Sequence, residues 1–332
     1  MIKLYHWWLD RVFPKKKIYA IILNMGINLR KLGILLGIAA LFLIGVTLLA
    51  FSYTDIGIAD LVGEEASAVT MADFSDVPES VAEDAVALAM ELYGDYHDKY
   101  TEFVNQLLIA YAKAKDKDFV VIFNAGGWGS DLLESSPGWH EICRGITDEL
   151  GKLGYSSLIL DYHRTAQSIW AFIKEFVEAI ADYPSKAKVL ASRVEFLTEH
   201  IPDVKIIVAG ESSGAVIADR VMDSLRDNPR VFSIQTGTPF WHRRETLERT
   251  LALDDNGIRP DSFARGDILT IIWSSLKALV GLSPPEGEDP GRILYFMHAP
   301  GHDYRWEYPG VYSKITQFLR QNFGLNQDIP SN

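Results

Sequence analysis

A serine between two glycines carries the clearest chemical signal in the chain. Gly210, Ser212 and Gly214 match the pattern Gly-x-Ser-x-Gly, which follows an apolar run (204–209) and precedes a helical pattern (215–225). In so tight a turn, side chains at the two glycines would strike neighbouring backbone, and the serine takes a strained conformation with its hydroxyl outward. The helix N-terminus favours developing negative charge. The pattern predicts a nucleophile at Ser212. The alternative is a serine-rich, phosphate-like turn or a plain turn between strand and helix.

Two histidines near the C-terminus are candidates for the general base that such a serine needs. His298 and His302 follow the last predicted strand and precede the last predicted helix. A general base must come within hydrogen-bond reach of the nucleophile. We expect His298 to end the strand, whereas His302 lies in the loop after Pro300 and Gly301 and is free to reach over the sheet. His302 is therefore the predicted base.

Acidic residues cluster after the predicted strand 250–253. Asp254, Asp255 and Asp261 all lie in this loop, and Asp267 follows further on. A carboxylate here would orient the imidazole and stabilise its cation. Most aspartates in such turns only hydrogen-bond to the backbone of the turn or contact solvent. The loop position alone therefore does not decide which aspartate orients the histidine.

The elements that must position these residues alternate along the chain. Short β-rich or apolar runs are Phe119–Asn124, Ser156–Asp161, Val204–Ala209, Val231–Thr236, Thr250–Leu253 and Ile293–His298. Helical patterns cover Pro78–Tyr93, Tyr100–Lys115, Trp139–Leu150, Ile169–Ile180, Val189–Leu197, Ala215–Leu225 and Val311–Phe323. The alternation predicts a three-layer α/β sandwich with a mostly parallel central sheet of about six strands. In such sheets the chemistry lies where strands end and helices begin.

With the serine motif in this context, the sequence resembles the α/β-hydrolase superfamily. The predicted nucleophile, acid and histidine occur in the order that this family uses. The resemblance covers roughly residues 118–323. It departs from full-size members, because the region before Phe119 looks helical and only about six strands are expected, so a trimmed, cutinase-sized or lipase-like core is implied.

The resemblance also implies an oxyanion hole and favours one acid. The segment 124–129 (NAGGWG) is placed like the family's oxyanion loop, although an asparagine stands where many members have histidine. The expected donors are the backbone N–H of Ser213 and one from Gly126, Gly127 or Trp128. The alternative is that these glycines only allow a tight turn of the backbone.

Asp255 is the preferred acid, since its Asp-Asn-Gly turn resembles the acid loop of lipase-like members. Asp254 and Asp261 are close alternatives.

The N-terminal part of the chain predicts a membrane anchor. Residues 33–51 contain no charge and are long enough to cross a bilayer. A cleaved signal peptide and a buried helix are the alternatives. Residues 1–32 carry seven basic residues against one acid, which places the N-terminus in the cytoplasm and the bulk of the chain outside. We expect a basic leader (1–32), one transmembrane helix (33–51), an acidic tether (52–80) and a hydrolase domain (81–325).

The predicted function is a membrane-anchored serine hydrolase that cleaves carboxylic esters, with an acyl ester or lipid as substrate. Apolar stretches at 169–180, with Trp170, Phe172 and Phe176, and at 268–282 could cap the serine or simply cover the sheet. No motif for a cofactor or metal appears, and the net charge of −12 argues against nucleic-acid binding. No obligate protein partner is evident. A peptidase, thioesterase or acyltransferase with the same triad, or a non-catalytic scaffold, is the alternative.

Overall fold

The computed structural model describes residues 76–94, 97–127, 133–162, 178–179, 181–244, 247–279, 282, 291–294 and 297–324. The basic leader, the predicted membrane anchor (33–51) and residues 52–75 of the predicted tether lie outside these residues, so they stay predictions. The same holds for Trp170, Phe172 and Phe176. Within the described residues, no helix combines the length and apolar character that crossing a membrane requires.

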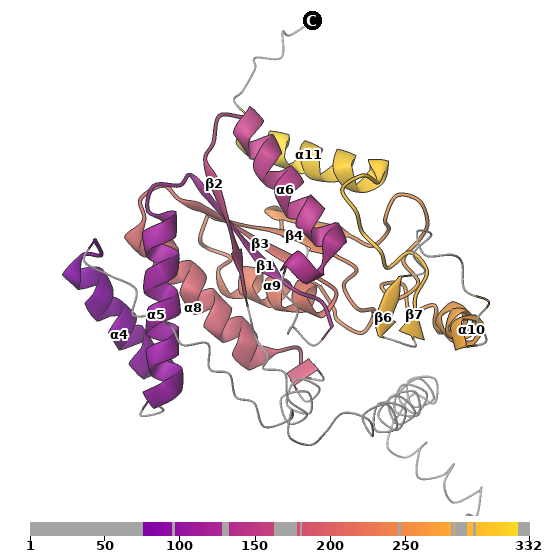
Figure 1. Ribbon diagram of the computed structural model, residues 1–332, viewed down its shortest axis with the longest axis horizontal. Coiled ribbons are helices and arrows are strands. Elements are labelled where there is room, and N and C mark those ends of the chain that lie inside the picture. The colour runs from indigo at the N-terminus through magenta and orange to yellow at the C-terminus, as the bar shows by residue number, and fades with distance from the viewer. Residues whose placement is uncertain are drawn as a thin grey trace, which may run out of the picture. The chain divides into compact units, whose positions relative to one another are not determined.

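A five-stranded parallel sheet forms the centre of the described fold (Figure 1). Its strands are β1 (Phe119–Asn124), β2 (Ser157–Asp161), β3 (Lys205–Glu211), β4 (Val231–Thr236) and β5 (Thr250–Leu253). They lie in the order β2-β1-β3-β4-β5, with every neighbouring pair parallel. β1 and β4 are buried along their whole length, which explains why β1 reads as a nearly continuous apolar run rather than as an alternating one.

Helices cover both faces of the sheet, as the alternating pattern predicted. One face packs against α5 (His97–Ala114), α8 (Pro184–His200) and α9 (Ser213–Ser224), and α4 (Glu79–Tyr93) packs on α5 and α8. The other face packs against α6 (Pro137–Lys152) and α11 (Pro309–Phe323). Successive residues of β1 divide between the two cores: Val120 and Ile122 belong to the first, and Phe119, Val121 and Phe123 to the second.

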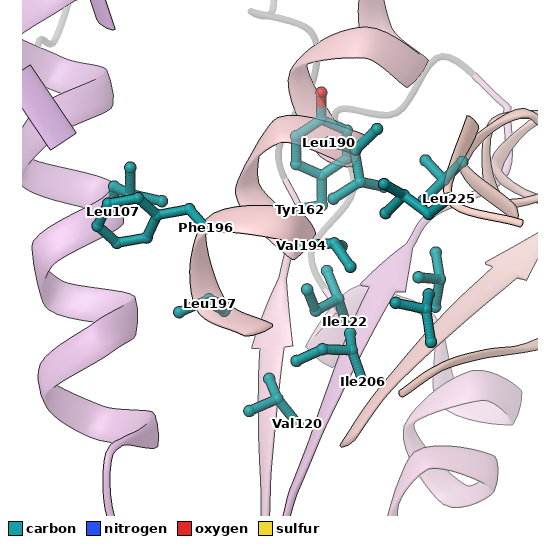
Figure 2. Packing of buried hydrophobic residues seen from close by; sticks show 14 of the residues in the cluster. Leu107, Val120, Ile122, Tyr162, Leu190, Val194, Phe196, Leu197, Ile206 and Leu225 are labelled. Carbon is teal, nitrogen blue, oxygen red and sulfur yellow. The ribbon is translucent and has the colours of Figure 1, made fainter. Parts of the chain in front are cut away.

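Figure 2 shows the first of these cores at close range. Val120 and Ile122 of β1 and Ile206 of β3 point toward the side of the sheet covered by α8, whose Leu190 and Val194 are among the fully buried residues. Burial of such side chains on both sides holds the strands at fixed register, and therefore fixes where each strand ends.

The prediction of a sixth strand in the main sheet is wrong. The run Ile293–His298 contributes instead to a small antiparallel pair, β6 (Arg292–Leu294) and β7 (Met297–His298), which is separate from the main sheet. The Ala299 N–H donates to the Gly291 carbonyl at 2.7 Å and extends this pairing. An apolar run identifies a buried strand but does not specify its partner, so the sequence could not distinguish these two outcomes.

Helix α10 (Ile268–Leu279) packs against β7, beside this hairpin (Figure 1).

Cys143 lies fully buried in α6, where burial raises the pKa of its thiol far above the usual range.

Candidate active site

Ser212 lies in the turn between β3 and α9 and has an unusual backbone. Its φ is 51° and its ψ is −115°, in the positive-φ region that non-glycine residues rarely adopt. A Cβ on Gly210 would lie 2.5 Å from the Gly214 carbonyl oxygen, and one on Gly214 would lie 2.2 Å from the Asn124 carbonyl oxygen. The steric reason predicted for the two glycines is thus confirmed. The Ser212 N–H donates to the Thr236 carbonyl at 2.9 Å, which ties the turn to β4.

Ser212 and His302 line one cavity of about 300 Å³ at the carboxyl end of the sheet. Both residues are more than nine-tenths buried. The remaining described lining residues are Gly126, Gly127, Ser136, Pro137, Gly138, Trp139, Glu211, Ile293, Asp303, Tyr304 and Arg305. Ile293 of β6 is part of this lining, and helix α10 contributes none of the described lining residues. The nucleophile and the base predicted from sequence therefore face the same space.

The imidazole of His302 is held by Asp261. Nδ1 of His302 lies 2.8 Å from Oδ2 of Asp261, whose side chain is completely buried. The same Oδ2 accepts a hydrogen bond of 2.8 Å from the Tyr304 hydroxyl, and Oδ1 accepts the N–H groups of Phe263 (2.8 Å) and Ala264 (3.0 Å). When Nδ1 donates to Asp261, Nε2 is the nitrogen that can accept a proton.

These contacts keep Asp261 ionised despite its burial. Burial alone would raise the pKa of Asp261, but the hydrogen bond and charge of His302, with the bonds from Ala264 and Tyr304, hold it below its ordinary value. Burial raises the pKa of Tyr304 well above its usual value, and the negative charge of Asp261 adds to this effect. Tyr304 therefore stays protonated and donates to Asp261.

The predicted acid, Asp255, does not contact the histidine. Its carboxylate lies 3.2 Å from the Lys314 amine through both oxygens and accepts the Gly257 N–H at 3.0 Å. The close alternative Asp254 forms an ion pair with Arg244. The structure thus corrects the choice of Asp255 in favour of Asp261, the other alternative.

The path of the acid loop explains this correction. Residues 255–260 turn back on themselves, closed by an isolated antiparallel bridge between Asp255 and Pro260. Asn256 supports the turn by accepting the N–H groups of Ile258 and Arg259. Because the loop doubles back, Asp261 returns to the end of β5, and its N–H lies 3.3 Å from the Asp254 carbonyl oxygen.

The oxyanion loop is described as far as Gly127. Gly126 and Gly127 line the cavity, and the Ser213 hydroxyl donates to the Gly127 carbonyl at 2.7 Å. This bond joins the loop after β1 to the first turn of α9. Trp128, the third predicted donor, lies outside the described residues. The side chain of Asn124 is buried below the loop and donates to the Ala209 carbonyl at 3.1 Å, so it links β1 to β3.

Two residues of the site were missed by sequence reasoning. Gly237, directly after β4, has a φ of 61°, and a Cβ there would lie 2.6 Å from Cε1 of His302 and 3.1 Å from Oδ2 of Asp261. A glycine at the carboxyl end of a buried strand was the signal that could have pointed to it. Tyr304, the second missed residue, gave no signal beyond its place two residues after His302.

The comparisons with known proteins are distant. No family model and no curated protein matches the chain. Among solved structures, a cutinase of Trichoderma reesei in complex with a C11Y4 phosphonate inhibitor is similar at 11% identity over 62% of this chain and 80% of that chain, with a TM-score of 0.30. A cutinase-like protein from Cryptococcus sp. is similar at 16% identity over 62% of this chain and 95% of that chain, with a TM-score of 0.35.

Proposed function

We propose that the protein is a serine hydrolase that cleaves carboxylic esters through an acyl-enzyme intermediate. The observation that carries the proposal is the arrangement of three residues at one cavity. Ser212 sits in a strained turn at the N-terminus of α9, and His302 lines the same cavity while a fully buried Asp261 holds its Nδ1. A nucleophile, a base and a residue that orients the base are the parts that acyl transfer requires.

In the first half of the reaction, Oγ of Ser212 attacks the acyl carbon of the ester. Nε2 of His302 takes the hydroxyl proton, and the negative charge of Asp261 stabilises the resulting imidazolium. The N–H of Ser213, at the start of α9, and an N–H of the loop that begins at Gly126 stabilise the oxyanion of the tetrahedral intermediate. His302 then gives its proton to the alkoxide oxygen as the ester bond breaks, which leaves the acyl group on Ser212.

In the second half, water replaces the alcohol. Nε2 of His302 takes a proton from the water as its oxygen attacks the acyl carbon, and returns that proton to Oγ of Ser212 when the acyl–serine bond breaks. The products are a carboxylic acid and the free enzyme.

We further propose that the predicted segment 33–51 anchors the protein in a membrane with its N-terminus in the cytoplasm. The hydrolase domain then lies on the other side of that membrane, where it can reach lipid esters.

Labelling with a fluorophosphonate probe tests the activated serine directly. The full chain in detergent is compared with Ser212→Ala, His302→Ala and the control Ser313→Ala, whose serine is exposed on α11. We expect labelling of the native chain and of Ser313→Ala, and none of the other two variants. Full labelling of Ser212→Ala, or no labelling of a folded native chain, would overturn the proposal.

Hydrolysis of p-nitrophenyl esters of increasing acyl length then defines the substrate class. A hydrolase of carboxylic esters turns these compounds over at rates that fall to background in Ser212→Ala. A protein that is labelled by the probe and releases no p-nitrophenol from any of them uses its serine for another acyl transfer reaction.

A further inference from the structure

Helix α10 presents an apolar face to solvent. Leu269 is 79% exposed, Trp273 61%, Leu276 50% and Ile272 38%. Their spacing of three, four and seven residues places all four on one side of the helix. We call these four residues the α10 stripe. The opposite side of the helix buries Ile271 in a small core with Phe263 and Ala299.

The stripe is a concentration of exposed apolar side chains and not a random scatter. Ten large hydrophobic residues are exposed within the described part of the chain, and five of them lie between Leu269 and Leu282. Single exposed apolar residues need no explanation, but a contiguous face of this kind marks a surface that contacts something apolar.

The composition of helix α10 suits a lipid surface. Helix α10 contains no acidic residue and one base, Lys277, whose amine lies 5.3 Å from the centre of the Trp273 ring. A tryptophan beside a lysine, on a helix free of acids, suits the boundary between acyl chains and headgroups.

The small core on the buried side of α10 adjoins the proposed active site. Ile293 of β6 packs against the core beneath α10 and also lines the cavity that holds Ser212. Phe263 of the same core contacts the His302 ring at 4.9 Å between centroids. A surface that received α10 would therefore lie close to the cavity.

The predicted membrane span, which lies outside the described residues, is an independent argument for a bilayer near the domain. The predicted membrane span ends at residue 51, and α4 begins at Glu79. The intervening segment has 27 residues, and a flexible chain of that length has an end-to-end distance of about 30 Å. A domain on such a tether stays within one domain diameter of the membrane, so even weak apolar contacts suffice for docking.

We propose that the α10 stripe docks on the surface of a phospholipid bilayer and brings the active-site cavity against esters held in that membrane. The docking surface itself is independent of the proposed hydrolase function. The delivery of membrane esters to Ser212 rests on that function.

Fluorescence quenching by lipids tests the docking. The full chain, carrying Leu276→Cys labelled with the environment-sensitive fluorophore nitrobenzoxadiazole, is reconstituted into phosphatidylcholine vesicles with or without brominated acyl chains. Cys143 is fully buried and does not take up the label in the folded protein. The matched control is Ser313→Cys, on the exposed side of α11. We expect brominated lipid to reduce the emission at position 276 at least twofold and to leave position 313 unchanged.

Two outcomes would overturn the membrane proposal. One is equal emission of the label at 276 in brominated and unbrominated vesicles. The other is a blue shift at 276 that no brominated lipid quenches and that grows with the ratio of protein to lipid, since it would assign the stripe to contacts between protein chains.

A second experiment separates docking from catalysis. In the double variant Leu269→Gln/Trp273→Gln, we expect hydrolysis of an ester embedded in vesicles to fall about tenfold, while hydrolysis of soluble p-nitrophenyl acetate stays at the native rate. Tyr312→Gln, an exposed aromatic residue on α11, is the control and should affect neither. Equal loss on both substrates would refute delivery by the stripe. A native chain that hydrolyses neither ester contradicts the proposed function, and the quenching result then still decides the docking.

Discussion

Gly237 lies directly against His302. Its φ of 61° is in the left-handed region, and a Cβ at this position would approach Cε1 of the imidazole to 2.6 Å. The glycine after β4 therefore leaves room for the imidazole of the proposed base, at the same strand end whose Thr236 carbonyl receives the N–H of Ser212. Strand β4 thus positions both the proposed nucleophile and the proposed base.

Replacing this glycine should disable the site without unfolding the protein. In Gly237→Ala the new methyl group must push the imidazole away, and we expect kcat to fall about 100-fold on a soluble ester, because displacement of a catalytic group by about 1 Å has effects of this size. Gly154→Ala is the control, since Gly154 also has a positive φ, of 91°, but a Cβ there would meet no atom within 4 Å. Comparable losses of kcat in both variants would assign the effect to backbone strain rather than to contact with His302.

The two aspartates of the acid loop give a second, matched comparison. We expect Asp261→Asn to lower kcat about 10⁴-fold, because an amide neither stabilises the imidazolium nor holds the correct tautomer. Asp255→Asn loses only a partly exposed ion pair with Lys314, so kcat should stay native and the free energy of unfolding should change by less than about 1 kcal/mol. Steady-state kinetics and urea unfolding of both variants check this. A large loss of kcat in Asp255→Asn would restore the prediction made from sequence.

These two residues also mark the limit of what the sequence predicts. The Gly-x-Ser-x-Gly pattern predicted the strand, the turn and the helix around Ser212, because steric rules specify that turn locally. The choice of Asp261 over Asp255 depended on a loop that doubles back through an isolated bridge, which is not a local property. The pairing of β6 with β7 was missed for the same reason, since an apolar run does not specify its partner strand.

Stability toward acid should depend on Asp261. The pKa of Asp261 is lower in the native protein than its ordinary value, so below about pH 4 the unfolded chain binds a proton there that the native state does not. The stabilisation from this group is fully present above the unfolded pKa and is lost as the pH falls through the native pKa. We expect the free energy of unfolding in urea to fall more steeply between pH 5 and pH 3 for the native chain than for Asp261→Asn. Parallel curves for the two proteins would contradict this assignment.

The hydroxyl of Ser213 joins α9 to the predicted oxyanion loop, because it donates to the Gly127 carbonyl at 2.7 Å. Ser213→Ala keeps the backbone N–H that we propose as an oxyanion donor but frees the loop, so we expect kcat to fall about tenfold with KM nearly unchanged, as for interactions made mainly in the transition state. Ser233→Ala is the matched control, because its buried hydroxyl donates to the Val208 carbonyl at 2.8 Å between β4 and β3, within the sheet. That variant also removes the acceptor of the buried Gln235 amide, so it should lose about 1 to 3 kcal/mol of stability and keep its kcat. If Ser213→Ala retains the native kcat while Ser233→Ala shows the expected loss of stability, the hydroxyl of Ser213 has no part in holding the oxyanion loop for catalysis.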